Sequence, residues 1–107
     1  MAKLIWTEPA LNDLDSIADY IALHDLQAAR GLVRRVFQHV GQLAEHPESG
    51  SRPTELRGKR YRQIVEPPCR IFYRYDGENV FILYVMREEM RFRTGRLKER
   101  DKRRPKT

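Results

Sequence analysis

Residues 59–87 have the sequence KRYRQIVEPPCRIFYRYDGENVFILYVMR, and this stretch decides the fold of the chain. It contains three strand-like runs, and the first two alternate apolar with basic residues. Pro67 and Pro68 end the first run, because two prolines in succession remove two hydrogen-bond donors from a sheet. Asp76-Gly77 favours a hairpin turn before the nearly continuous apolar run Val80–Met86. The stretch therefore predicts an antiparallel three-stranded meander that carries several arginines.

Two helical patterns precede the meander. In the first, Leu11, Leu14, Ala18 and Ile21 recur at the spacing of one helix face. The second pattern begins after Asp25, a predicted N-cap, and its apolar positions keep helical spacing to Ala44. About three residues join the two patterns, so they predict an antiparallel helical hairpin.

The opening residues 3–7, KLIWT, predict a short strand. The element order β-α-α-β-β-β then indicates an α+β domain, in which the N-terminal strand is followed by a helical hairpin packed on a twisted antiparallel sheet. The opening strand lies at an edge or pairs with the last strand, and the pattern leaves both possibilities open. At 107 residues the chain forms one domain, which we expect to span residues 1–92.

The net charge of +6 is unevenly distributed. Residues 91–107 carry nine Lys/Arg against two acids, a net +7, and the remaining residues carry twelve against thirteen, a net −1. With few apolar residues, positions 93–107 are predicted to form a basic C-terminal tail that is mobile. Two interpretations of this tail stay open: a non-specific tether to nucleic acid, or a solvated terminus without a role.

Several classes of protein are disfavoured by the composition. No apolar stretch approaches the about 18 residues of a membrane span, and the N-terminus lacks the pattern of a signal peptide, so we expect a cytoplasmic protein without membrane partners. The single Cys69 excludes an intrachain disulfide. The histidines and the cysteine share no metal-ligand spacing, so neither a metal nor a cofactor is expected.

Motifs along residues 3 to about 90 resemble, in order, the RelE/ParE superfamily of toxins. They are A-L-x-D-L-x-x-I-A-x-Y-I (10–21), A-A-R-x-L-V-x-x-V (28–36), L-A-E-H-P-x-x-G (43–50), R-x-I-V (62–65), R-I-F-Y-R (70–74) and V-M-R (85–87). The resemblance implies the compact β-α-α-β-β-β fold. It also implies the toxin of a bacterial type II toxin–antitoxin module, of the plasmid-stabilisation type, that a cognate antitoxin neutralises.

The resemblance covers two chemistries. ParE-like members poison DNA gyrase without being enzymes, which is the function we favour for this chain. RelE-like members are metal-independent endoribonucleases that cut mRNA on the ribosome. A third possibility is a degenerate toxin that only binds its antitoxin. Whether the protein is an enzyme therefore stays open at the level of sequence.

The resemblance also nominates site residues. If the chain is a nuclease, the catalytic candidates are Arg62, Arg70 and Arg87. The candidates for binding nucleic acid or another target are Arg60, Arg62, Arg70, Arg74, Arg87 and Phe92. For Arg62, Arg70 or Arg74 taken alone, a solvated surface residue paired with Glu55, Glu66 or the antitoxin is the favoured interpretation. For Arg60, Arg62, Arg70 and Arg87 taken together, the surface and the site interpretations are equally favoured.

Proton transfer is the difficulty for a nuclease. An arginine titrates above about 12 and is a poor general base near neutrality. No His or Tyr follows Val85, and the possible bases Glu66 and Glu88 have no spacing that supports either.

The antitoxin is predicted to bind with an acidic or amphipathic segment. This segment would cover Arg60, Arg62, Arg70 and Arg87, with apolar docking on the helical hairpin. The stoichiometry stays open, and a heterotetramer is one possible assembly.

Overall fold

The computed structural model describes residues 1–105 of the chain. The elements are β1 (Lys3–Trp6), α1 (Glu8–Ala22), α2 (Leu26–Gly41), β2 (Tyr61–Glu66), β3 (Cys69–Tyr75), β4 (Asn79–Arg87) and α3 (Thr94–Lys102), with short 3-10 helices at Gln42–Ala44 and Thr54–Leu56. The four strands form one sheet in the order β1-β4-β3-β2. The predicted α+β fold is confirmed. β1 fulfils both alternatives, because it is an edge strand and pairs with the last strand, in parallel.

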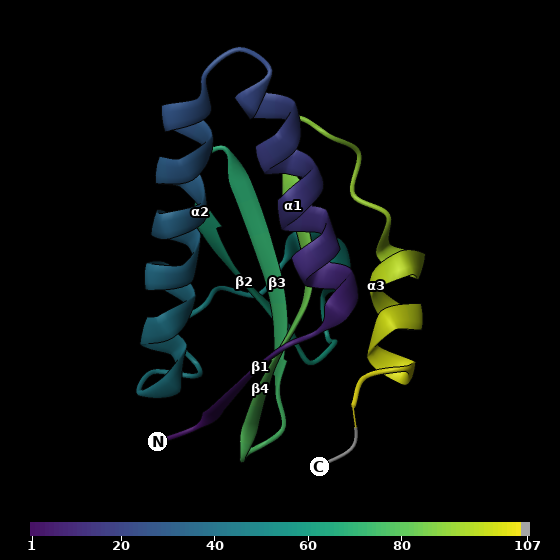
Figure 1. Ribbon diagram of the computed structural model, residues 1–107. Helices are drawn as coiled ribbons and strands as arrows, with labels where there is room; N and C mark the ends of the chain where they lie inside the picture. Colours follow the sequence, from purple (N-terminus) through teal and green to yellow (C-terminus); the bar gives the residue numbers. More distant parts are fainter. Residues whose placement is uncertain (106–107) are drawn as a thin grey trace.

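The helical hairpin covers one face of the sheet (Figure 1). Leu14 of α1 and Leu32 and Val36 of α2 are buried against sheet residues such as Ile71 and Ile82. Asp25 caps α2 as predicted, since its side chain accepts a hydrogen bond from the amide of Ala28 at 3.0 Å. This face is a conventional apolar core.

The opposite face of the sheet carries a second apolar cluster. It includes Phe72, Phe81, Leu83 and Tyr84 from the strands. A register shift between β3 and β4 lets the consecutive residues Leu83 and Tyr84 both face this side. The apolar run of the last strand is thus buried on both faces, as its composition predicts.

The C-terminal segment differs from the prediction of a mobile tail. Residues 94–102 form α3, which lies beside the sheet next to α1 (Figure 1). Leu97 is fully buried in the second apolar cluster, and Asp101 is 6% exposed. The structure differs from the prediction because Arg100 bonds to Asp13 of α1, and Asp101 accepts hydrogen bonds from Tyr61 and Arg74 of the sheet. Lys106 and Thr107, the end of the predicted tail, lie outside the described residues.

Within residues 1–105, no helix combines the length and the apolar character needed to cross a membrane.

Candidate functional site

The sheet divides the predicted arginines between its two faces. Residues paired across neighbouring strands point to the same side. Arg62 pairs with Tyr73 of the helix-side core, and Arg87 pairs with Cys69 of the same core. Arg70 pairs with Met86, a residue of the opposite cluster. Arg74 pairs with Tyr61 of β2 and Phe81 of β4, which belong to the same opposite cluster. The predicted arginines therefore do not converge on one surface.

Arg70 is held by an internal carboxylate. Its two terminal nitrogens donate to the two carboxylate oxygens of Glu55 at 2.9 and 3.0 Å, and its Nε donates to Gln63 at 2.8 Å. The hydrogen bonds from Arg70 lower the pKa of Glu55. The guanidinium also lies 4.8 Å from the ring centre of Phe72. Each of the three guanidinium nitrogens of Arg70 therefore donates a hydrogen bond within the chain.

Phe92 packs against the aromatic residues that lie beside Arg70. Its ring stacks on Phe72 at 4.2 Å and meets Tyr84 edge-on at 5.7 Å. The Arg70 guanidinium lies 5.3 Å from the centre of the Phe92 ring. Phe92 is therefore engaged with its own sheet, and its stacked face is not open to a base.

Arg74 belongs to a cluster centred on Asp101 of α3. The Asp101 carboxylate accepts hydrogen bonds from Arg74 at 2.8 Å, Arg104 at 2.7 Å and the Tyr61 hydroxyl at 2.9 Å. Burial, together with the hydrogen bond to Asp101, raises the pKa of Tyr61 to about 12. Arg74 thus binds α3 to the sheet.

Arg62 supports the loop that follows the helical hairpin. It donates to the carbonyls of Glu48 and Gly50 at 3.0 and 2.9 Å. The Gly50 amide in turn donates to the Tyr73 hydroxyl at 2.9 Å, and a β-carbon at Gly50 would lie only 2.6 Å from that oxygen. Arg60, by contrast, is exposed in the segment before β2.

Arg87 lies at the end of β4 on the helix side. Its guanidinium is 4.5 Å from the Tyr20 ring centre and 3.2 Å from the Glu89 carboxylate. The two possible bases are placed apart from Arg70. Glu66 pairs with Arg35 and His39 on the helix side, and Glu88 is exposed after β4.

Other titratable groups of the sheet are unsuited to proton transfer near neutrality. Cys69 is fully buried, and burial raises the pKa of its thiol to about 11. Burial also raises the pKa of Tyr73. Among the described residues, no group of three or more His, Cys, Asp or Glu side chains is arranged to hold a metal ion.

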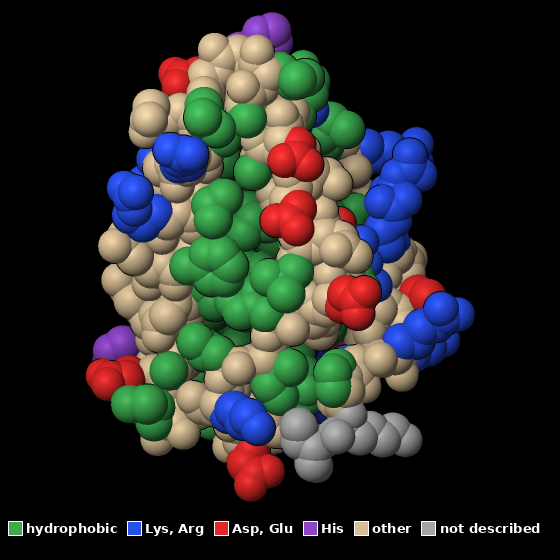
Figure 2. Space-filling view, viewed as in Figure 1, with side chains coloured by type: hydrophobic (Ala, Val, Ile, Leu, Met, Phe, Trp, Pro, Cys, Tyr) green, Lys and Arg blue, Asp and Glu red, His purple; other side chains and the backbone are tan. Residues whose placement is uncertain are grey.

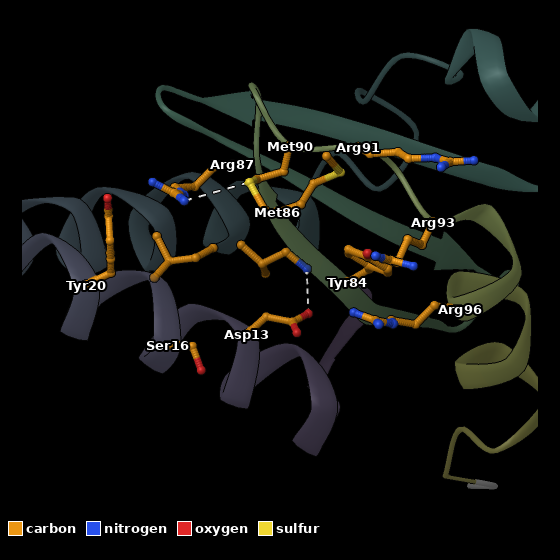
Figure 3. Close-up of a pocket in the computed structure, with 12 residues that line it drawn as sticks. Asp13, Ser16, Tyr20, Tyr84, Met86, Arg87, Met90, Arg91, Arg93 and Arg96 are labelled. Atoms are coloured by element: carbon orange, nitrogen blue, oxygen red, sulfur yellow. Dashed lines mark hydrogen bonds between the residues drawn. The ribbon is translucent and has the colours of Figure 1, made fainter.

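A groove beside β4 gathers Arg87 with three basic residues that the sequence did not nominate (Figure 3). Its volume is about 350 Å³, and its basic lining consists of Arg87, Arg91, Arg93 and Arg96. On the α1 side, Asp13 accepts a hydrogen bond from the Val85 amide at 3.0 Å. The excess of basic residues after β4 was the available signal, but only the structure shows that they line one groove.

An apolar strip runs along the hairpin between α1 and α2 (Figure 2). The exposed large apolar side chains of the hairpin include Tyr20, Leu23, Leu26 and Phe37, with exposures of 53%, 77%, 51% and 42%. Phe37 also contacts Trp6, with the ring centres 4.9 Å apart. Exposed apolar side chains in this number are typical of a site for a protein partner.

Comparisons with known proteins identify the family. The family described as ParE toxin of type II toxin-antitoxin system, parDE, matches residues 4–92. Toxin Y4kP of Sinorhizobium fredii is 39% identical over 84 residues, which cover 78% of this chain and 85% of the relative. Toxin RelE2 of Caulobacter vibrioides is 37% identical over 78 residues, which cover 72% of this chain and 85% of the relative.

A solved structure agrees with these relatives. A chain of the chromosomal ParDE toxin–antitoxin system from P. aeruginosa superimposes with a TM-score of 0.67 at 31% sequence identity. The match covers 81% of this chain and 96% of the solved chain. The protein described above belongs to the ParE toxin family of the RelE/ParE superfamily and is the toxin of a ParDE/RelE-type toxin–antitoxin system.

Proposed function

We propose that this toxin arrests growth by binding and poisoning DNA gyrase, and that it does not cut mRNA. The observation that carries the proposal is the internal pairing of Arg70. A nuclease needs positive charge directed at the scissile phosphate and a group that moves a proton. Arg70 instead faces Glu55, Gln63 and two phenylalanine rings.

Glu55 is a poor substitute for the missing base. Its pKa is lowered by the same arginine that holds both of its oxygens, so its affinity for a proton is reduced. The other two nuclease candidates, Arg62 and Arg87, lie on the opposite side of the sheet. The arrangement supports a binding protein better than a phosphodiesterase.

The antitoxin is proposed to use two surfaces that meet near Tyr20. An amphipathic helix would cover the apolar strip between α1 and α2. An acidic segment would then occupy the groove beside β4, where Arg87 and Arg91 supply charge. This differs from the segment predicted from sequence, because Arg62 and Arg70 already have internal partners on opposite faces.

The decisive experiment induces the toxin in a bacterium that lacks the antitoxin. A gyrase poison should trigger the DNA-damage response and filamentation while protein synthesis continues at first. Purified toxin should also inhibit supercoiling by gyrase in a reaction that contains no ribosomes. The double variant Arg70→Gln/Glu55→Gln removes both charges of the pair, and it should still inhibit gyrase.

Two results would overturn the proposal. Primer extension on an abundant transcript could reveal codon-phased cuts that disappear in Arg70→Ala, which would establish an mRNA endonuclease. Alternatively, the toxin could bind the protein encoded by the adjacent reading frame yet arrest neither growth nor gyrase, which would establish a degenerate toxin.

A further inference from the structure

We propose that the outer surface of α3 is a docking surface for double-stranded DNA. Only the inner side of the helix is used for packing. Leu97 and Asp101 are buried, and Arg100 and Arg104 bond to Asp13 and Asp101. The remaining half of the helix faces solvent and forms part of the edge where Lys and Arg side chains gather in Figure 2.

The exposed charges of α3 form two flanks. With 3.6 residues per turn, Lys98 and Lys102 are neighbours on one flank. Arg96 and Arg103, two turns apart, share the other flank. Neither lysine has an ion-pair partner among residues 1–105, and Arg103 has only an exposed pair with Glu99, which contributes little.

Two basic flanks on one helix match the two phosphate backbones that border a groove of duplex DNA. The major groove is about 12 Å wide, and a helix with its side chains is about 10–12 Å across. Lysine and arginine on opposite flanks can therefore reach phosphates of both strands. A single strand offers one line of phosphates and would use only one flank.

Other polyanionic partners fit this surface less well. Single-stranded nucleic acid is bound largely by stacking on aromatic rings, and Phe92, next to α3, is stacked on Phe72. A membrane surface requires exposed apolar side chains on the helix, but Leu97 is fully buried. Duplex RNA is recognised partly through its 2′-hydroxyls. The two flanks consist of cationic side chains, and none of these can accept a hydrogen bond from a 2′-hydroxyl: Arg96, Lys98, Lys102 and Arg103.

The lysine flank of this surface is independent of the choice between gyrase and the ribosome, and of the antitoxin, whereas Arg96 of the other flank also lines the groove beside β4. Lys98 and Lys102 lie outside the groove beside β4, and the family match ends at residue 92. Loss of DNA binding through Lys98 and Lys102 would therefore leave the proposed gyrase poisoning untouched. Failure of gyrase poisoning would likewise leave DNA binding through these lysines untouched.

The test is a salt titration of the full-length protein on a random DNA duplex of about 30 base pairs. Each phosphate contact contributes about −0.9 to the slope of log K against log salt. Lys98→Gln/Lys102→Gln should therefore flatten the slope by about 2, and Arg96→Gln/Arg103→Gln by a similar amount. Far-UV circular dichroism checks that both variants remain folded.

The matched control is Arg30→Gln/Arg34→Gln. These arginines are exposed on α2 with the same four-residue spacing, so the variant loses the same charge from another surface. Its slope should equal that of the parent protein. Equal slopes for all variants would overturn the proposal, as would binding to single-stranded DNA, duplex RNA or phosphatidylserine vesicles that equals or exceeds binding to duplex DNA.

Discussion

The two faces of the sheet are covered in different ways. Two helices, α1 and α2, cover one face with a continuous set of apolar side chains. On the other face, α3 contributes a single buried apolar residue, Leu97, and is held mainly by charged contacts of Arg100, Asp101 and Arg104. Apolar burial responds little to salt or moderate changes of pH, whereas ion pairs respond to both. The hairpin face should therefore determine global stability, and α3 should detach first.

The largest effect is expected on the hairpin face. Leu32 is 1% exposed, so Leu32→Ala leaves a cavity and should lower the free energy of unfolding by about 2–5 kcal/mol. Urea denaturation measures the change. Leu26→Ala, at a position of the same helix that is 51% exposed, should cost less than about 1 kcal/mol. Similar losses in both variants would contradict an apolar core at this face.

A smaller and more local effect is expected for Asp101→Asn. Removal of one partner of a buried ion pair costs about 3–5 kcal/mol when the other charge stays buried. Here α3 can detach and return Arg74 and Arg104 to water, so the loss should be smaller. Hydrogen exchange should show faster exchange of α3 amides, with β4 unchanged. Glu99→Gln, which removes only an exposed ion pair, should leave both elements protected. Uniform exchange of α3 and β4 would show that the two faces unfold together.

Alkaline pH should weaken the α3 face through Tyr61. Its pKa is raised to about 12 in the folded state, while an unfolded tyrosine titrates near about 10. The unfolded state therefore releases its proton first, and this contribution to stability is complete below pH 10 and is lost as the pH rises toward 12. The slope should not exceed about 1.4 kcal/mol per pH unit. Tyr61→Phe should remove this component from the dependence of unfolding free energy on pH, whereas Tyr20→Phe should retain it.

The smallest effect is expected at the partly exposed pair Arg70–Glu55. Because the pKa of Glu55 is lowered on folding, the pair stabilises the protein above the usual carboxylate range and loses this contribution as the pH falls through the folded-state value. Solvent screening limits the effect of Glu55→Gln at neutral pH to less than about 1 kcal/mol. The parent protein and the variant should therefore converge in stability once the pH falls below the lowered folded-state pKa of Glu55. A difference that persists there would indicate another role for Glu55.

The sequence predicted the fold better than it predicted the site. Helical spacing, Asp25 and the turn at Asp76-Gly77 are local signals, and each appears in the structure, with φ of +100° at Gly77. The face on which an arginine lies depends instead on strand register, which composition does not reveal. The packing of α3 was missed because Asp13 and Arg100 are 87 residues apart, and a count of charges does not show which of them pair.

The edge of β4 beyond β1 is covered by side chains instead of by another strand. β1 accompanies β4 only as far as Ile82, and beyond it the Val85 amide bonds to Asp13 while the Leu83 carbonyl accepts from Arg100. Two side chains thus occupy the positions where the backbone of another strand would bond. Removal of α3 would expose part of this edge on the most buried strand, so the helix should also protect the free toxin against intermolecular strand pairing and aggregation.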